Sequence, residues 1–305
     1  MFVEFDLAGA EWVVVAYLAG DQNMIDIVES GRSPHVATGS LLTGVPEDLV
    51  IREHELLGSA TDPDGLLMVR NAELPELMNG GYFIPRSMTI RQAGKKSNHG
   101  LNYDMRYKRF ALENEMTETD AKPIVDKYHN DAYPGIRNVF HEEVRQELKK
   151  NDRTLVNLLG RRVRLMDQAG PDLWDKAYSY KPQSTVADII LRGVVSAYND
   201  DSPLMAYMGL RANVHDSVLV NWPDAMQEEL PAFVAKMIGY LSPELECKGR
   251  RFTLSVDVKV GPNWGAMEKL RLSKTPKHTT EELLEHWRSG WNASTEATCT
   301  GQDVL

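Results

Sequence analysis

Two apolar runs separated by a short polar turn constrain the fold of this chain more than any other feature. The runs cover residues 207–214 and 218–222, and the sequence His-Asp-Ser at 215–217 lies between them. This pattern is typical of a β-hairpin. Residues 252–258 alternate apolar and polar side chains, and the chain opens on the apolar run 2–5, so each predicts a further strand.

Helical patterns occupy much of the chain between these strands. Residues 91–105 and 139–150 are predicted to be helices, and the acidic start and basic end of the second match the helix dipole. A further helix is expected after Pro182, where Thr185 and Asp188 fit a capping box.

Other segments give a less definite pattern. Residues 12–18 are apolar throughout and fit either a helix or a strand. From about residue 38 to 84 the sequence loses a clear period and gathers Gly and Pro, so we expect loops with short helices and interpret the segment as an insert. Residues 271–305 are expected to form a tail with one helix near 280–288.

Composition limits the class of protein. With 305 residues, 42% of them hydrophobic, the chain can form one large or two modest domains. No apolar stretch approaches the roughly 20 residues that span a bilayer, so no membrane partner is expected. The two cysteines, Cys247 and Cys299, have no CxxC spacing, which argues against a disulfide framework or a structural zinc site and favours a reducing, cytoplasmic compartment.

The net charge of −10 argues at first against a nucleic-acid partner, because such proteins usually present basic surfaces to phosphates. Basic residues nevertheless concentrate in segments 86–96, 106–109 and 161–164. Local basic faces can therefore exist on an acidic protein.

A pair of aspartates, Asp6 and Asp216, is expected at strand ends. Two such carboxylates can together bind two divalent ions about 3.5–4 Å apart, the arrangement that stabilises both oxygens of an in-line phosphoryl displacement. Taken singly, each aspartate has a simpler structural explanation, which is preferred to metal binding: Asp6 as a helix cap and Asp216 as part of the turn.

Four residues spaced four apart, Arg91, Lys95, His99 and Tyr103, would form one slowly turning stripe on a helix. Arginine and lysine can neutralise a triphosphate, and a ring further along can stack on a base. This stripe is suited to a nucleotide. The alternative is a solvated basic helix face, which is the commoner explanation for a run of charge.

Two glycines, Gly94 and Gly100, lie within the same predicted helix. Each costs helix stability of roughly 1 kcal/mol relative to alanine. Such a cost indicates that something must approach the helix closely, which weighs against a merely solvated face.

A third group combines the basic segment 160–164 (GRRVR) with Gln183. Arginines and a glutamine amide can follow a nucleic-acid backbone and its minor-groove acceptors. Alone, the group is ordinary surface charge.

Five motifs of this chain, in the order in which they occur, resemble those of the polymerase domain of family A DNA polymerases. This family includes bacterial DNA polymerase I and many phage replicases, and the phage type fits best. The resemblance covers residues 1–268 and rests on five motifs. Those motifs are 6–11 (DLAGAE) for D-Y-S-Q-I-E, called motif A; 20–23 (GDQN) with His35 for G-D-x-N…D-I-H; 91–103 (RQAGKKSNHGLNY) for R-x-x-x-K-x-x-N-[FY]-G-x-x-Y, called motif B; 183–188 (QSTVAD) for Q-G-T-A-A-D; and 214–217 (VHDS) for V-H-D-E, called motif C.

The resemblance implies catalytic roles for part of this set. Asp6 and Asp216, with the main-chain carbonyl of Leu7, would hold two Mg²⁺ ions. Lys95 would protonate the leaving group. The triphosphate would be bound by Lys95 together with Arg91 and His35.

The resemblance implies recognition roles for the others. Glu11 would exclude a ribose 2′-hydroxyl, His99 would stand at the base-stacking position, and Tyr103 would lie under the templating base pair. Arg161, Gln183 and His215 would contact the primer-template DNA near its terminus.

The fold that the resemblance implies is α+β, with an antiparallel palm sheet and mainly helical fingers. Residues 1–24 would form the first part of the palm, and 151–270 the second part. Residues 25–150 would form the fingers, with the insert near 37–86, and 271–305 the tail.

Three positions depart from the family pattern. His99 stands where the family has Phe or Tyr, Asp104 replaces a glycine, and Ser217 replaces the acidic residue of motif C. That acid is not one of the two essential metal ligands, so activity is expected to survive its loss.

The family places its thumb, part of its palm and any exonuclease domain before motif A, whereas five residues precede Asp6. We therefore expect the C-terminal part of a split or truncated enzyme, without thumb or exonuclease domain. Its expected partners are primer-template DNA, dNTPs and a separate N-terminal polymerase fragment that supplies the thumb and the rest of the palm. A phage-encoded chain would act in the cytoplasm of a bacterial host.

The expected activity is that of a DNA-directed DNA polymerase. A single-subunit RNA polymerase shares the palm, the Arg/Lys helix and often His-Asp-Ser at motif C, but Glu11 argues against it because such enzymes leave room for the ribose hydroxyl. A non-catalytic DNA-binding subunit derived from a polymerase is disfavoured by the retention of both aspartates and Lys95.

Overall fold

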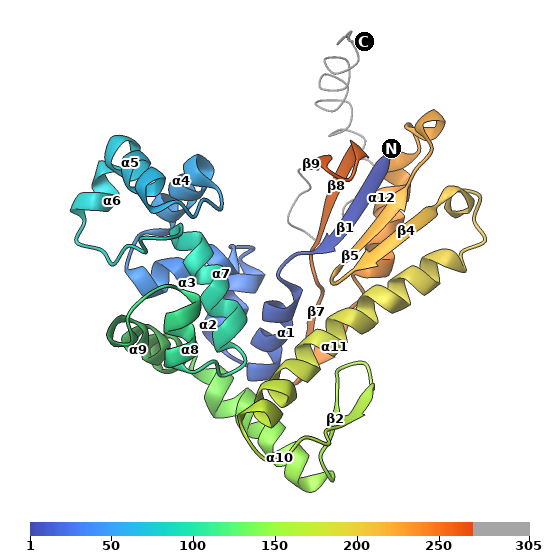
Figure 1. The fold of residues 1–305 in the computed structure, drawn as a ribbon. Coiled ribbons are helices and arrows are strands. Elements are labelled where there is room, and N and C mark those ends of the chain that lie inside the picture. Colours follow the sequence, from blue (N-terminus) through green and yellow to red (C-terminus); the bar gives the residue numbers. More distant parts are fainter. Residues whose placement is uncertain (271–305) are drawn as a thin grey trace. The chain divides into compact units, whose positions relative to one another are not determined.

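The computed structural model describes residues 1–270 (Figure 1). They divide into two compact units. The first consists of residues 1–10, 185–246 and 251–270, and the second of residues 11–184 and 247–250. The expected tail, with its helix near 280–288, lies outside the described residues.

The first unit is built on a five-stranded antiparallel sheet with the strand order β4-β5-β1-β8-β9. Its strands are β1 (Phe2–Leu7), β4 (Gly209–Val214), β5 (Ser217–Asn221), β8 (Val256–Asn263) and β9 (Ala266–Lys269). The predicted hairpin and opening strand are confirmed. The strand expected over 252–258 begins only at Val256, because residues 253–255 leave the ladder.

One face of this sheet forms the core of the unit. The odd-numbered residues of β1, among them Val3 and Phe5, are fully buried. Phe5 packs edge-on against Phe233 of helix α12 (Leu230–Leu241) with ring centroids 5.9 Å apart, and Trp222 stacks on the same ring at 4.3 Å. The even-numbered residues of β1 therefore point to the opposite, polar face, because side chains alternate along a strand.

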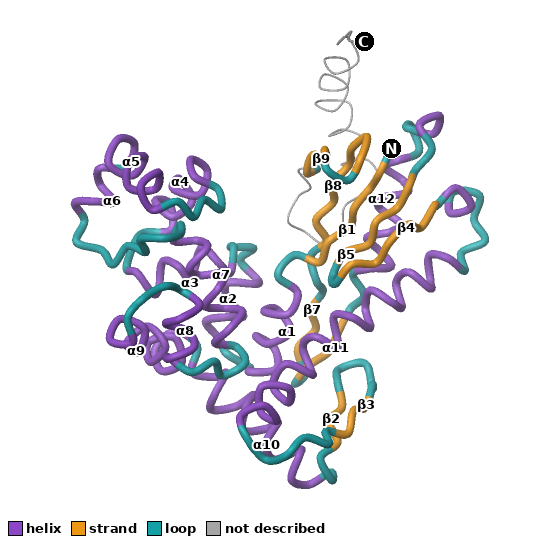
Figure 2. The backbone as a smooth tube through the Cα atoms, in the orientation of Figure 1, coloured by secondary structure: helices purple, strands orange, loops and turns teal. Residues whose placement is uncertain are grey.

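Helices make up most of the second unit, as the purple segments of Figure 2 show. They are α1 (Ala10–Ala19), α2 (Gln22–Glu29), α3 (Pro34–Thr43), α4 (Glu47–Leu57), α5 (Pro63–Glu73), α6 (Pro75–Asn79), α7 (Ile90–Leu101), α8 (Tyr107–Glu113), α9 (Glu118–Lys127) and α10 (Glu142–Lys150), with π-helical turns at Tyr128–Ala132 and Ile136–His141. Residues 1–270 also contain short elements: the strands β2 (Thr154–Val156), β3 (Arg162–Arg164), β6 (Leu245–Cys247) and β7 (Arg250–Phe252), and 3₁₀ turns at Met205–Tyr207 and Asp224–Met226.

The ambiguous segment 12–18 is helical, as part of α1. Every side chain from Trp12 to Ala19 is buried. A helix that is buried all round carries no polar stripe, which is why the sequence shows no helical period there.

The insert is more helical than its composition predicts. Asp62 caps α5 by accepting a hydrogen bond of 2.9 Å from the Gly65 amide, and Pro63 takes the first helical position. Ser33 and Pro34 begin α3 in the same way. These prolines mark helix starts rather than loops. Amides in the first turn of a helix have no intrahelical partner, so the N–H group that proline lacks is not needed there.

The long helix α11 (Pro171–Tyr198) corrects the helix start predicted after Pro182. Pro182 lies in its interior, while Thr185 and Asp188 are buried along its length rather than placed at an end. Buried residues on both sides of the proline, such as Tyr178 and Ile189, indicate that packing outweighs the one backbone hydrogen bond that proline removes. Among residues 1–270 no helix has both the length and the apolar character required to cross a membrane.

Candidate functional site

Asp6 and Asp216 lie next to each other at one end of the sheet, where β1 ends and β5 begins. Asp6 is the penultimate residue of β1 and pairs with Ser217 of β5. Asp216 is the second residue of the two-residue turn between β4 and β5, and its carbonyl accepts a hydrogen bond of 3.0 Å from the Leu7 amide. His215, the first turn residue, has a left-handed φ of 55° and an exposed side chain. The structure thus brings together all four residues predicted for this end of the sheet.

The electrostatics at this end of the sheet favour a cation. Burial, and then the Asp216 carboxylate, raise the pKa of Asp6 to about 6, with smaller contributions from Asp257 and Glu4. Lys259 acts in the opposite direction and lowers that pKa. A half-buried carboxylate that is repelled by its neighbours gains from a bound positive charge.

Nearby carboxylates on the polar face are already neutralised. Lys259 Nζ lies 2.6 Å from Glu4 Oε2, and Lys269 Nζ lies 2.5 Å from Asp257 Oδ2. By contrast, no ion pair or hydrogen bond to a side-chain oxygen of Asp6 is present within residues 1–270, and the same is true of Asp216. The two catalytic candidates are therefore the carboxylates left to bind something else.

The residues present suit a hard cation. Two carboxylates and the Leu7 carbonyl supply the oxygen ligands that Mg²⁺ prefers. Across residues 1–270 no group of three or more His, Cys, Asp or Glu side chains is arranged to hold a metal, so this pair, not a larger cluster, is the candidate. Asp257, opposite Asp6 on β8, was missed in the sequence, although the alternation over 252–258 places it on the polar face.

The second unit holds the nucleotide-binding candidates around α7. Arg91, Lys95 and His99 lie on this helix, and within residues 1–270 neither Arg91 nor Lys95 has a hydrogen-bonding or ion-pairing partner. Burial lowers the pKa of Arg91. A pocket of about 360 Å³ opens beside the helix, lined by Gln92, Lys95, Lys96, His99, Gly100, Met105, Arg109 and Glu113. Lys95, which lines this pocket and has no partner among the described residues, is suited to a phosphate group.

Tyr103 is not on the helix, contrary to the predicted stripe. Helix α7 ends at Leu101, and Asp104 takes a left-handed φ of 64° in the turn that follows. The Tyr103 hydroxyl instead donates a hydrogen bond of 2.5 Å to Glu11 Oε2 at the start of α1. Burial and the Glu11 carboxylate raise the pKa of Tyr103 well above its usual value, so the hydroxyl keeps its proton.

Asn98 of α7 is hydrogen-bonded to His35 of α3. Its side-chain oxygen accepts hydrogen bonds from Thr38 Oγ1 (2.9 Å) and Tyr128 OH (3.0 Å). Its amide nitrogen must therefore donate, to the Pro34 carbonyl and to His35 Nδ1, at 3.3 and 3.2 Å. With Nδ1 accepting, the proton of neutral His35 is on Nε2. Asn98 is part of motif B, but its positioning role follows only from these long-range contacts.

His35 is neutral at physiological pH. Burial is the largest cause that lowers its pKa to about 3, and the positive charges of Arg91 and Lys95 add to it. A neutral ring beside two cations can donate from Nε2 without adding to their repulsion.

A close helix contact explains one of the two glycines. A Cβ at Gly94 would lie 2.2 Å from the His35 carbonyl oxygen and 2.7 Å from the Gly39 amide nitrogen, both in α3. The predicted close approach at Gly94 is therefore the backbone of a neighbouring helix. At Gly100 the neighbour is a side chain, because a Cβ there would lie 2.7 Å from the terminal methyl carbon of Met105.

Arg161 and Gln183, the predicted DNA contacts in this unit, lie on adjoining elements. The Arg161 carbonyl accepts a hydrogen bond of 2.9 Å from Tyr180 OH of α11. Asn157 Nδ2 donates to Ser184 Oγ at 3.1 Å. These two contacts bracket the exposed Gln183 in the sequence, so the β2–β3 turn rests on the part of α11 that carries it.

Comparison with known proteins identifies a family. Residues 85–266, more than half of the chain, match the family model of DNA polymerase family A. The thermostable DNA polymerase I of Thermus thermophilus is 24% identical over 271 residues, covering 86% of this chain and 26% of that protein. DNA polymerase I of Chloroflexus aurantiacus is 22% identical over 281 residues, covering 89% and 25%. The chain thus spans about a quarter of the length of these curated relatives.

A solved structure has a similar fold. It is described as the POL domain of Pol1 from M. smegmatis in complex with DNA primer-template and dNTP. The TM-score is 0.61 at 21% identity, and the alignment covers 86% of this chain and 40% of the other. The expected α+β fold, with its antiparallel sheet and mainly helical remainder, is confirmed.

Proposed function

Because this chain belongs to DNA polymerase family A, we propose that it is a DNA-directed DNA polymerase that adds dNTPs to the 3′-hydroxyl of a primer under the direction of a template. The observation that carries the proposal is the placement of Asp6 and Asp216 together at one end of the sheet. Both carboxylates are without a partner among the described residues. Unpaired, half-buried carboxylates side by side are costly unless they bind a cation.

Enzymes of this family generally depend on divalent metal ions. In this chain Asp6, Asp216 and the Leu7 carbonyl would hold two Mg²⁺ ions. Such ions, when bound, supply the positive charge that favours both the attacking and the leaving oxygen of a phosphoryl displacement. The raised pKa of Asp6 supports this assignment, because a buried carboxylate that is also repelled by Asp216 is stabilised by a bound cation.

The second unit would bind the triphosphate. Arg91 offers a planar fork for phosphate oxygens, and Lys95 a point charge that can pass a proton to the leaving pyrophosphate. His35 would donate from Nε2, since Asn98 fixes Nδ1 as the acceptor. The lack of other partners for Arg91 and Lys95 within residues 1–270 supports these roles.

Sugar and base would be recognised by Glu11, Tyr103 and His99. The Tyr103 hydroxyl holds the Glu11 carboxylate in place, which is what exclusion of a ribose 2′-hydroxyl requires. A steric gate of this kind favours dNTPs and disfavours the RNA polymerase alternative.

Primer-template DNA would be contacted by Arg161, Gln183 and His215, all of them exposed. The structural neighbour is described as a complex with DNA primer-template and dNTP. A separate polypeptide that supplies a thumb and the rest of the palm remains a proposed partner.

The test is extension of a labelled primer-template by the purified chain with Mg²⁺ and either dNTPs or rNTPs, with and without an added thumb-containing chain. We expect extension with dNTPs, and its loss in Asp6→Ala and Asp216→Ala while both remain folded. The exposed Asp201→Ala is the matched control and should extend like the parent. Extension by the Asp6 or Asp216 variant would overturn the metal assignment; extension with rNTPs alone would favour an RNA polymerase, and none with either would favour a non-catalytic subunit.

A further inference from the structure

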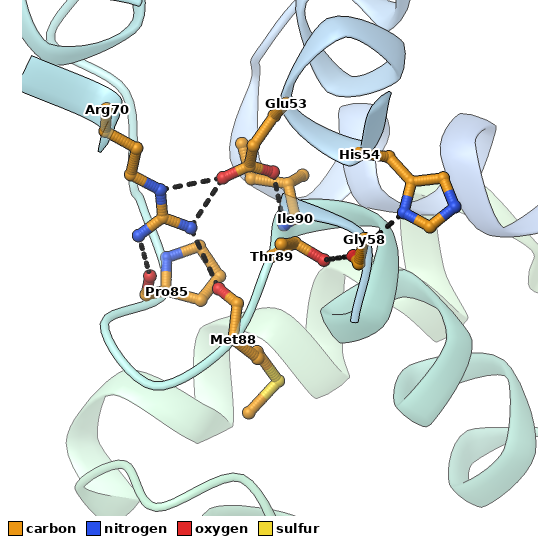
Figure 3. A network of polar contacts seen from close by, with 8 residues as sticks. All are labelled: Glu53, His54, Gly58, Arg70, Pro85, Met88, Thr89 and Ile90. Atoms are coloured by element: carbon orange, nitrogen blue, oxygen red, sulfur yellow. Dashed lines mark hydrogen bonds and ion pairs between the residues drawn. The ribbon is translucent and has the colours of Figure 1, made fainter. Parts of the chain in front are cut away.

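A buried ion pair lies in the insert, outside every matched motif. Glu53 of α4 and Arg70 of α5 have side chains that are 0% and 3% exposed. Arg70 Nε donates to Glu53 Oε1 at 2.7 Å, and Arg70 Nη2 lies 2.5 Å from the same oxygen (Figure 3). Residues 85–266 match the family model, so neither partner belongs to the matched segment.

The remaining polar groups of this pair bind the segment that leads into α7. Arg70 Nη1 donates to the Pro85 carbonyl at 2.7 Å and Nη2 to the Met88 carbonyl at 2.9 Å. Glu53 Oε2 accepts a hydrogen bond of 2.7 Å from the amide of Ile90, the first residue of α7. Figure 3 shows both side chains pointing toward this segment from their own helices.

Glu53 takes the place of a local helix cap. Thr89 stands at the N-cap position of α7 but makes no side-chain cap hydrogen bond, and its hydroxyl donates to the Gly58 carbonyl at 3.2 Å instead. A negative charge at a helix N-terminus is favourable both for the free amides and for the helix dipole. The first turn of α7 is therefore held by a carboxylate from another helix.

Apolar packing also holds the start of α7. Ile90 belongs to an apolar cluster that includes Val36 of α3, Val50 of α4 and Leu74. A Cβ at Gly39 would lie 2.7 Å from the Ile90 carbonyl oxygen, so α3 also touches the backbone there. The start of α7 is held from both sides, one residue before Arg91.

We propose that Glu53 and Arg70 are positioning residues, which set the first turn of α7 and thereby place the Arg91 guanidinium for the triphosphate. The insert is then part of the nucleotide-binding apparatus rather than a passive addition. The link to the triphosphate rests on the proposed function, whereas the coupling of Glu53 to the start of α7 is independent of it.

The experiment compares Glu53→Gln and Arg70→Met with the double variant Glu53→Leu/Arg70→Met. Each single change leaves its partner buried without compensation, so it lowers the unfolding temperature as well as disturbing α7. The apolar double variant removes both charges and should recover most of the lost unfolding temperature. It still lacks the acceptor for the Ile90 amide.

Two measurements separate positioning from stability. The first is KM for dNTP against kcat in primer extension, and the second is hydrogen exchange of the amides at residues 90–94. We expect all three variants, including the recovered double variant, to raise KM roughly tenfold, as misplacement of one phosphate-binding group does, with kcat within about twofold of the parent. Exchange at Ile90 should accelerate in the double variant.

Glu76→Gln is the matched control, because it breaks an exposed ion pair of the same insert, Arg52–Glu76, with side chains 52% and 41% exposed. It should leave KM and exchange unchanged. A double variant that regains the parent's KM together with its stability would show that the pair acts through stability alone and would overturn the inference. If the parent itself does not extend primers, the proposed function fails, and exchange at Ile90 still decides whether Glu53 holds the helix: parent-like exchange in the double variant refutes it.

Discussion

The Tyr103 hydroxyl donates a hydrogen bond of 2.5 Å to Glu11, which lies 92 positions earlier in the sequence. The turn after α7 is thereby joined to the first turn of α1. Glu11 is held in one orientation by a partner that keeps its proton, because burial and the carboxylate itself raise the pKa of Tyr103.

Removal of the Glu11 carboxylate should weaken sugar discrimination. We expect Glu11→Ala to lower the ratio of kcat/KM for dNTP over rNTP by roughly tenfold or more, equivalent to about 1.4 kcal/mol. Tyr103→Phe should have a smaller effect in the same direction, because it frees the carboxylate without deleting it. The measurement is single-nucleotide incorporation with matched dNTP and rNTP.

Tyr107→Phe provides the control for this pair of variants, since the Tyr107 hydroxyl has no hydrogen-bond partner within residues 1–270. It should leave the ratio unchanged. An unchanged ratio in Glu11→Ala would refute the gate.

Asp6 should make the metal-free protein less stable as the pH rises. Its folded-state pKa of about 6 lies above the ordinary value near 4, so the favourable contribution is present below about pH 4 and is lost as the pH passes 6. At pH 8, Asp6→Asn should therefore be more stable than the parent by about 1–2 kcal/mol, after allowance for solvent screening. Urea unfolding in EDTA at pH 4 and pH 8 measures the difference.

Mg²⁺ gives the complementary arm of that measurement. It should stabilise the parent at pH 8 more than at pH 5, and Asp6→Asn less at either pH, because the ion binds the carboxylate form. Equal stabilisation of parent and variant would place the ion elsewhere.

His129 should be a stability defect that grows in acid. Its side chain is buried, and both ring nitrogens lack a hydrogen-bond partner in the described structure. Burial is the main cause that lowers its pKa to about 2, so stability is present above the ordinary value near 6.5 and is lost as the pH falls. His129→Leu should gain about 1–2 kcal/mol over the parent at pH 7, and more at pH 5.

Thermal or urea unfolding of parent and variant at the two pH values checks this expectation. The decisive result is whether the stability advantage of the variant over the parent grows from pH 7 to pH 5. A variant that gains nothing between pH 7 and pH 5 would show that the ring is not kept neutral by burial.

Two helical glycines should respond oppositely to the same substitution. Gly94→Ala places a methyl group 2.2 Å from the His35 carbonyl oxygen, which is backbone and cannot move aside cheaply, so a loss of about 2 kcal/mol or more is expected. At Gly239 of α12 an added methyl group would meet nothing within 4 Å, and Gly239→Ala should stabilise by up to about 1 kcal/mol. Urea midpoints compare the two, and equal effects would contradict the close contact.

The sequence predicted best where a short-range pattern decides the structure. Alternation and a two-residue polar turn are local properties, so β1 and the β4–β5 hairpin, with Asp6 and Asp216 at their ends, could be located. Proline was the main source of error. Pro63 begins an 11-residue helix in a segment where loops with short helices were expected, and Pro182 lies inside a helix that was expected to start after it.

The parts of the site that could not be predicted depend on contacts between distant residues. Asn98 orients His35 across 63 positions, and Glu53 caps a helix that begins 37 residues later. No spacing rule connects such pairs, because they meet only when separate helices pack. Tyr103 was assigned to the helix because motif spacing continues past Leu101, where the backbone turns away.

The glycine contact at Gly94 also bears on motion. The backbones of α3 and α7 approach so closely there that no side chain fits between them. We therefore expect a rotation that carries Lys95 to carry His35 with it, with the hinge outside the helix pair. The two side chains would therefore travel as one rigid body, with their mutual spacing preserved from the first encounter with a ligand to its release.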